Sequence, residues 1–274
     1  MYYDNQIFKC ALEDYTRNEN IGGDVTSKMR KTGTTIVGVR FADGVVLGAD
    51  TRATEGNIVA EKNCQKIHYI ADNIYCCGAG TAADTEFVTR IISSKVELHR
   101  LQNDPLRKPR VAMATRMLKQ YLFRYQGYVG AALILGGVDF EGPKLLSIHP
   151  HGSSDALPYV TMGSGSLAAV SELESLYRPN LTREEAMELV RRAIRKGIDH
   201  DMGSGSNVDL CIITKEGTEN IRTYEEAHKK GQRLNKYHFS SGTTPVLRSS
   251  VHPIEMDIVS TRIIRDLPQE MEIS

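Results

Sequence analysis

The chain has 274 residues, 41% hydrophobic and 25% charged, which is enough apolar content to bury a sizeable core. Its 34 Lys and Arg balance its 34 Asp and Glu, which argues against binding nucleic acid or an anionic membrane through bulk charge. No stretch approaches the roughly 20 apolar residues of a membrane-spanning helix. The five cysteines have no metal-ligand spacing, and without a signal peptide they are expected to be reduced thiols in the cytoplasm or nucleus.

Residues 1–33 are polar and mixed in charge, and Gly22 and Gly23 interrupt any helix there. The segment lacks the apolar run of a signal peptide and is too acidic for a transit peptide. Two interpretations are open from its composition: a loose tail or a removable pro-segment.

Two hairpins are predicted next. β-Branched residues favour a strand at Thr34–Phe41, and the Asp43-Gly44 turn returns the chain as a strand at Val45–Ala49. Ile67–Ile70 and Ile74–Cys77 have the pattern of a second hairpin.

A helix pair and three strands follow. Apolar residues at helical spacing predict helices over Thr81–Leu101 and Arg110–Tyr125. Strands are expected at Gly130–Val138, Lys144–His149 and Tyr159–Met162. The apolar stripe of the first helix is expected to contain Phe87, Val88, Ile91, Ile92 and Leu98.

A second helix pair is predicted at Leu167–Tyr177 and from Thr182, where Glu185 three residues later completes a capping box. Late strands are expected at Asp209–Thr214 and Glu219–Thr223. The order of strands, two helices, strands, two helices and strands, with hairpins dominating, predicts an α/β (α+β) fold. We expect a four-layer α-β-β-α sandwich of two mainly antiparallel sheets.

Residues 225–274 are polar and contain three prolines, which predicts an extended arm lying on another surface. The tetrapeptide Gly-Ser-Gly-Ser occurs twice, at Gly163–Ser166 and Gly203–Ser206, each time beside a predicted helix.

The loop Gly78–Ala83 has the dinucleotide-binding pattern G-x-G-x-x-A between a predicted strand and a helix. Its strand belongs to a hairpin and not to a βαβ unit, which argues against a nucleotide. Close packing of a helix start and an oxyanion-stabilising backbone N–H are the two other interpretations. The eight histidines have no ligand-like spacing, so no metal site is predicted.

Three polar residues lie at predicted strand ends. Thr34 opens the first strand, Asp50 ends the second, and Lys66 opens the next strand pair. On adjacent strands of one antiparallel sheet, these side chains would share one edge.

These residues belong to motifs that resemble active beta subunits of the 20S proteasome, over about Thr34 to Val259. The motifs are Thr34-Thr-Ile-Val-Gly, Gly48-Ala-Asp-Thr-Arg-Ala-Thr, Lys66, Gly78-Ala-Gly-Thr-Ala-Ala-Asp and Gly203-Ser-Gly-Ser-Asn-Val-Asp. Others resemble the trypsin-like eukaryotic type: Phe123-Arg-Tyr-Gln-Gly-Tyr, Leu135-Gly-Gly-Val-Asp and Pro158-Tyr-Val-Thr-Met-Gly-Ser-Gly-Ser.

The resemblance implies an N-terminal nucleophile hydrolase, a threonine-type endopeptidase in precursor form. Residues 1–33 would be a pro-segment removed by self-cleavage at Gly33-Thr34, 34–224 the catalytic domain and 225–274 the arm. The amide nitrogen of an uncleaved Thr34 cannot accept a proton. Cleavage would convert it to an amine with an ordinary pKa of about 8, which a neighbouring cation lowers.

The resemblance also implies roles for individual residues. Thr34 would be the nucleophile, Lys66 would lower the pKa of the nucleophilic centre, Asp50 would pair with Lys66, and the Gly80 N–H would be the oxyanion donor. The supporting residues around the amine would be Ser164, Asp201 and Ser204, with Asp199 as the alternative to Asp201. Neither a metal nor an organic cofactor is implied.

The substrate-binding residues implied are Ala53, Thr54, Cys64, Gly78, Ala82 and Glu86. Gly78 would leave the pocket mouth open, and the Glu86 carboxylate would suit a Lys or Arg side chain, so cleavage after basic residues is expected.

The implied partners are proteasome alpha and beta subunits, in a particle of twenty-eight subunits in four stacked rings. The arm would lie on the neighbouring third beta subunit, and the substrates would be unfolded polypeptides marked by ubiquitin. Neither nucleic acid nor membrane is an expected partner. Alternatives are a catalytically silent ring subunit, a nucleotide-binding protein and an unrelated N-terminal nucleophile amidase.

Overall fold

The computed structural model describes residues 32–103, 107–229, 240–243 and 246–262. Most of the proposed pro-segment lies outside them. The chain divides into two units, Met1–Lys229 and Lys230–Ser274.

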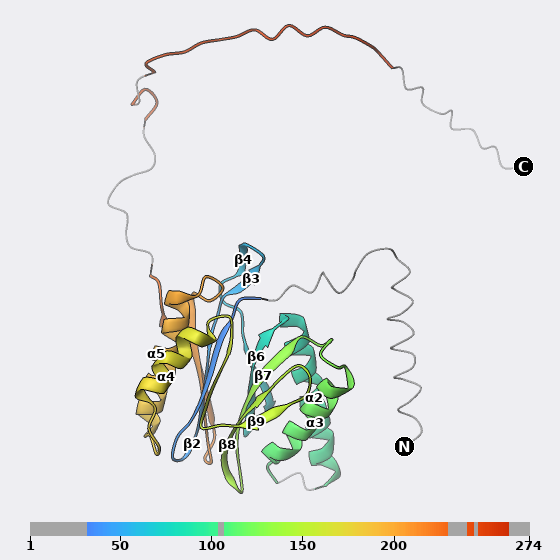
Figure 1. The fold of residues 1–274 in the computed structure, drawn as a ribbon, viewed down its shortest axis with the longest axis vertical. Helices are drawn as coiled ribbons and strands as arrows, with labels where there is room; N and C mark the ends of the chain where they lie inside the picture. The colour runs from blue at the N-terminus through green and yellow to red at the C-terminus, as the bar shows by residue number, and fades with distance from the viewer. Residues whose placement is uncertain (1–31, 104–106, 230–239, 244–245, 263–274) are drawn as a thin grey trace, which may run out of the picture. The chain divides into compact units, whose positions relative to one another are not determined.

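The first sheet of the larger unit carries the two strands predicted nearest the N-terminus. Its strands are β1 (Thr35–Arg40), β2 (Gly44–Asp50), β10 (Tyr159–Gly163), β11 (Asn207–Thr214) and β12 (Thr218–Glu226). They lie in the order β10-β1-β2-β11-β12, and every pair is antiparallel. The helices α4 (Ser166–Leu176) and α5 (Arg183–His200) cover its outer face (Figure 1).

The second sheet is also antiparallel throughout, in the order β5-β6-β7-β8-β9. Its strands are β5 (Ile67–Ala71), β6 (Ile74–Gly80), β7 (Ala131–Asp139), β8 (Gly142–Ile148) and β9 (Ser154–Ala156). The helices α2 (Ala82–Gln102) and α3 (Val111–Arg124) pack on its outer face. Figure 1 shows the two helix pairs on opposite sides of the two sheets, which confirms the predicted four-layer sandwich.

Three apolar clusters hold these layers together, one under each helix pair and one between the sheets. The sheets approach closely at two glycines. A Cβ atom on Gly38 of β1 would lie 2.7 Å from Leu145, and one on Gly136 of β7 would lie 2.9 Å from Val45. The spacing between the sheets therefore depends on the absence of side chains at these two positions.

Two helix starts are capped by side-chain oxygens, one from a neighbouring residue and one from a residue far along the chain. The Thr182 hydroxyl accepts the Glu185 N–H at the start of α5, and the Glu185 carboxylate accepts the Thr182 N–H, as the predicted capping box requires. At the start of α3, the buried Asp139 carboxylate accepts the Val111 N–H at 3.1 Å.

Some sequence predictions were wrong in detail. The exposed hairpin β3 (Ala53–Glu55) and β4 (Ile58–Glu61) was not predicted, and neither was β9. Exposed strands have no buried face, so they leave no alternating pattern to detect. On α2, Phe87 and Leu98 are 60% and 58% exposed, because Thr85, Thr89 and Val96 take part in the buried face instead.

The second unit has a turn at residues 240–243, where the Thr243 N–H donates to the Ser240 carbonyl at 3.1 Å. Residues 240–243 and 246–262 contain no helix or strand. Their large apolar side chains are solvent-exposed: Val246, Leu247, Val251, Ile254, Met256, Ile258 and Val259. The domain limits at 33 and 224 remain a prediction.

Within the described part of the chain, no helix is long and apolar enough to cross a membrane.

Candidate active site

Thr34 lies immediately before β1 and is almost completely buried, with 1% of its surface exposed. Its N–H donates to Ser164 Oγ at 3.1 Å, and its carbonyl oxygen accepts the Gly165 N–H at 3.2 Å. Its hydroxyl donates to the carbonyl oxygen of Gly33 at 2.6 Å. The hydroxyl is thus held against the peptide bond that precedes it.

Asp50 ends β2, the strand that pairs with β1, and is completely buried. Its carboxylate accepts backbone N–H groups from Thr35 at 2.9 Å, Arg52 at 3.2 Å and Gly205 at 3.1 Å. Burial raises the pKa of the Asp50 carboxyl above its ordinary value, against the opposing effect of Lys66 and these hydrogen bonds.

Lys66 lies immediately before β5, and its ammonium group lies between Asp50 and Gly33. Its Nζ atom is 2.7 Å from Asp50 Oδ1 and 3.1 Å from the Gly33 carbonyl oxygen. The side chain is 6% exposed. Because β5 is in the second sheet, the prediction that Thr34, Asp50 and Lys66 share one sheet edge was wrong. The three side chains meet at one end of the sandwich, between facing sheets.

The two Gly-Ser-Gly-Ser loops converge on the carboxylate of Asp201. Ser164 from the first loop and Ser204 from the second each donate a hydroxyl to Asp201 Oδ2 at 2.6 Å, and the Gly203 N–H donates to Oδ1. Although burial alone raises the pKa of the Asp201 carboxyl, these hydrogen bonds lower it below its ordinary value.

Asp199, the alternative to Asp201, points elsewhere. Its two carboxylate oxygens share the single Nε–H of Arg195, each at 3.2 Å, within the last turns of α5. The geometry therefore favours Asp201 as the carboxylate near Thr34.

The two residues that precede Thr34 run along the end of β6. The Thr32 N–H and hydroxyl both donate to the Gly80 carbonyl oxygen, at 3.1 and 3.0 Å, in an antiparallel bridge. On the other side, the Gly33 N–H donates to the Thr54 hydroxyl at 2.8 Å. Residues 32 and 33 are thus held on both sides, by Gly80 and by Thr54.

Gly33 and Gly80 both need the absence of a side chain. A Cβ atom on Gly33 would lie 2.3 Å from the Gly203 backbone. Gly80 has a φ of +113° and lies against the Gly130 carbonyl. Among the hydrogen bonds of the described residues, the Gly33 carbonyl accepts from Thr34 and Lys66 and not from the Gly80 N–H.

A pocket of about 290 Å³ opens beside Thr34. Five of the six predicted substrate-binding residues line it: Ala53, Cys64, Gly78, Ala82 and Glu86. Thr54 is outside the lining and binds the Gly33 N–H instead. A Cβ atom on Gly78 would lie 2.7 Å from Thr85, so a side chain there would disturb the wall that this threonine forms.

The carboxylate in the pocket lining is that of Glu86, on the first turns of α2, and the lining also includes Lys66. The Glu86 carboxylate is 58% exposed and pairs with Arg90 at 2.7 Å, one helical turn later. Burial raises the pKa of the Cys64 thiol, which therefore stays neutral near pH 7.

Three residues of this region were missed by the sequence analysis. His68 lines the pocket, and burial lowers the pKa of its imidazole below 6.5. Arg52 lies against Gly205 and donates to the Met202 carbonyl at 3.1 Å, which braces the loop that carries Ser204. Thr35 binds Ser204 through its hydroxyl at 2.6 Å. A single His, Arg or Thr in a sequence carries no motif that distinguishes a residue of a functional site from the same residue type elsewhere.

The Gly78–Ala83 segment does not have the topology of a dinucleotide site. Strand β6, which leads into it, is antiparallel to both of its neighbours, β5 and β7. A dinucleotide fingerprint needs a parallel βαβ unit. The glycines instead allow close packing at Thr85 and Gly130.

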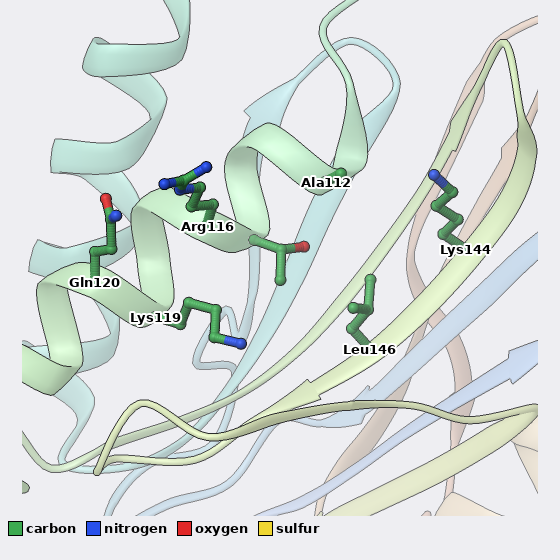
Figure 2. Close-up of a pocket in the computed structure, with 7 residues that line it drawn as sticks. Ala112, Arg116, Lys119, Gln120, Lys144 and Leu146 are labelled. Carbon is green, nitrogen blue, oxygen red and sulfur yellow. The ribbon is translucent and has the colours of Figure 1, made fainter.

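A second hollow of about 540 Å³ lies between α3 and β8 (Figure 2). Arg116, Lys119 and Lys144 make its lining cationic, and Lys119 extends from α3 to donate to Ser154 Oγ at 2.9 Å. None of the predicted site residues lines this hollow.

Among the described residues, no group of three His, Cys, Asp or Glu side chains is arranged to hold a metal ion.

Comparison of the sequence with known proteins assigns the chain to a family. The model of the family "Proteasome subunit" matches residues 30–213, and that of "Proteasome beta subunits C terminal" matches residues 227–263. Proteasome subunit beta type-7 of Dictyostelium discoideum is 59% identical over 84% of this chain and 85% of its own. The probable proteasome subunit beta type-2 of Schizosaccharomyces pombe is 57% identical (88% and 90% covered), and the beta type-10 subunit of Bos taurus is 54% identical (85% of each).

Proposed function

The chain belongs to the proteasome family as a beta subunit of the 20S core particle, and we propose that it is a threonine-type endopeptidase that cleaves after basic residues. Its activation would be self-cleavage at Gly33-Thr34. The observation that carries this proposal is the position of the Gly33 carbonyl oxygen, which accepts both the Thr34 hydroxyl and the Lys66 ammonium.

In the activation step, the Thr34 hydroxyl oxygen bonds to the Gly33 carbonyl carbon, and the bond from this carbon to the Thr34 nitrogen breaks. The hydroxyl proton ends on the departing nitrogen, which leaves an ester between Gly33 and Thr34 Oγ. Water then hydrolyses the ester, releasing a Gly33 carboxylate and restoring the hydroxyl. Lys66 stabilises the negative charge that develops on the carbonyl oxygen.

Cleavage supplies the base that the mature enzyme needs. The Thr34 nitrogen, an amide in the uncleaved chain, donates to Ser164 Oγ. As a free amine it could take the hydroxyl proton when Thr34 attacks a substrate. The charged groups around it are Lys66, whose cation lowers the pKa of the amine, and the carboxylates of Asp50 and Asp201. The Gly80 N–H is proposed as an oxyanion donor once residues 32–33 have left.

The pocket accounts for the proposed specificity. Gly78 leaves room for a long side chain, and the Glu86 carboxylate offers a partner for a Lys or Arg at its far end. Ala53, Cys64 and Ala82 form the less polar walls, and Thr54 would bind the substrate backbone as it binds Gly33.

The proposal extends to assembly and location. Proteasome beta subunits assemble with other subunits of the core particle, and the apolar side chains exposed in residues 246–262 fit an arm that a neighbouring beta subunit would cover. We place the subunit in a four-ring particle of the cytoplasm and nucleus that degrades unfolded polypeptides marked by ubiquitin.

The test is the intact mass of this chain from assembled particles, together with hydrolysis of short peptides that carry Arg or Leu immediately before the scissile bond. A chain that starts at Thr34 and a preference for Arg support the proposal. A chain that keeps residues 1–33 in mature particles would favour the silent structural subunit instead. A free Thr34 with no preference for Arg would retain the protease and overturn the specificity.

A further inference from the structure

Thr35 lies directly behind the nucleophile and is completely buried. Successive side chains of a strand point to opposite faces, so Thr34 faces Lys66 while Thr35 faces the helix layer. There Thr35 is enclosed by two glycines at the helix ends. A Cβ atom on Gly165 would lie 2.0 Å from its hydroxyl oxygen, and one on Gly197 would lie 2.4 Å from it. The hydroxyl therefore has little freedom to turn away.

The direction of the hydrogen bond between Thr35 and Ser204 follows from their neighbours. The two hydroxyl oxygens are 2.6 Å apart. Ser204 gives its one proton to Asp201 Oδ2 at 2.6 Å, so Thr35 must be the donor to Ser204. Ser164 donates to the same Asp201 oxygen and accepts the Thr34 N–H. A continuous chain of hydrogen bonds thus joins Thr35 to the nitrogen of the nucleophile.

The backbone of Thr35 joins the other half of the site. Its N–H donates to Asp50 Oδ1 at 2.9 Å, the oxygen that also binds Lys66 Nζ. Among the described residues, Thr35 is therefore the one that is hydrogen-bonded to both Asp50 and Ser204.

We propose that Thr35 is a positioning residue of this active site, whose hydroxyl orients Ser204 and Asp201 toward the Thr34 amine. This inference rests on the proposed function, because it assigns Thr35 a part in the chemistry of the freed Thr34.

The loss of the Thr35 hydroxyl has a specific electrostatic consequence. Ser204 would lose its donor, and its own bond to Asp201 would weaken because hydrogen bonds in a chain polarise one another. The negative charge of the Asp201 carboxylate would then be less well stabilised by hydrogen bonds and would favour the protonated form of the Thr34 amine. The other charged neighbours of this amine are Asp50 and Lys66. The amine would need a higher pH to act as a base.

The experiment compares assembled particles that contain Thr35→Val, which keeps the shape without the hydroxyl, with particles that contain Thr35→Ser, which keeps the hydroxyl. Intact mass first establishes that each chain starts at Thr34. We expect Thr35→Val to lower kcat about tenfold with little change in KM, and to move the acidic limb of kcat/KM to higher pH. Thr35→Ser should restore the limb to its normal position.

Several outcomes would overturn the inference. One is a lower rate for Thr35→Val at every pH with an unmoved acidic limb, and another is an equal loss in both variants. If Thr35→Val does not enter particles, the smaller Thr35→Ala is measured in the same way. Failure of both hydroxyl-free variants to assemble would assign Thr35 to folding alone. Wild-type particles without a free Thr34 would instead refute the proposed function.

Discussion

Lys66 Nζ lies 3.1 Å from the carbonyl oxygen of Gly33, although the two residues come from facing sides of the sandwich. The ammonium group therefore contacts the bond that is proposed to break as well as the Asp50 carboxylate. This double contact makes Lys66 a residue whose loss affects both the chemistry and the fold.

Lys66→Met should abolish self-cleavage and destabilise the chain, because it leaves Asp50 buried without its cation. Breaking a buried ion pair in this way typically costs about 3–5 kcal/mol. Denaturant unfolding and intact mass measure the two effects. Lys62→Met, at a nearby exposed position, is the control and should change neither.

Thr34→Ala should leave residues 1–33 attached, because no hydroxyl remains to attack the Gly33 carbonyl. Thr34→Ser retains a hydroxyl and should still cleave. Mass spectrometry of the chain from assembled particles distinguishes the two variants. Cleavage at Gly33-Thr34 in the alanine variant would show that another protease removes the segment.

The predictive value of the sequence can be judged from particular residues. Helix α5 was predicted well because its capping box and buried stripe are both local. The pairing of Asp50 with Lys66 was implied only by resemblance, and its placement between two sheets was missed. Strand order along the chain does not say in which sheet a hairpin lies. Thr35 and His68 owe their positions to distant contacts, so their surroundings are not visible in the sequence.

Glu86→Gln should lower kcat/KM by about fivefold for peptides with Arg immediately before the scissile bond, since an exposed ion pair contributes at most about 1 kcal/mol. Peptides with Leu at the same position should be unchanged. Arg90→Gln should have the opposite effect, about twofold, because Arg90 competes with the substrate for Glu86. Equal changes for both peptides would contradict this assignment.

The pocket should lose affinity for basic substrates at low pH. Burial lowers the pKa of His68 below 6.5, so its ring is neutral at pH 7 and gains a proton only as the pH falls further. A cation at His68 would then compete with the substrate for Glu86. The KM for an Arg peptide should rise only as the pH falls below the ordinary imidazole pKa of about 6.5, and His68→Gln should remove this rise. The exposed His149→Gln variant serves as the control.

Gly197→Ala should impair both maturation and activity. The new methyl group would lie 2.4 Å from the Thr35 hydroxyl oxygen, and such overpacking typically costs about 1–3 kcal/mol. Gly217→Ala places its methyl group in open space and is the matched control. Equal thermal unfolding temperatures and peptidase rates for the two variants would contradict this prediction. They would show that the contact between Thr35 and Gly197 can relax without loss of function.

The close approach of the two sheets at Gly38 and Gly136 links the geometry of the proposed site to the packing of the core between the sheets. Thr34 and Asp50 come from one sheet and Lys66 from the other, so the distances among them report how far apart the sheets stand. A larger side chain between the sheets, far from any reacting atom, would push them apart. The distances from Lys66 Nζ to Asp50 and to the Gly33 carbonyl oxygen would then increase. A chain with a badly packed interior would then fail to release its own threonine and would remain inert.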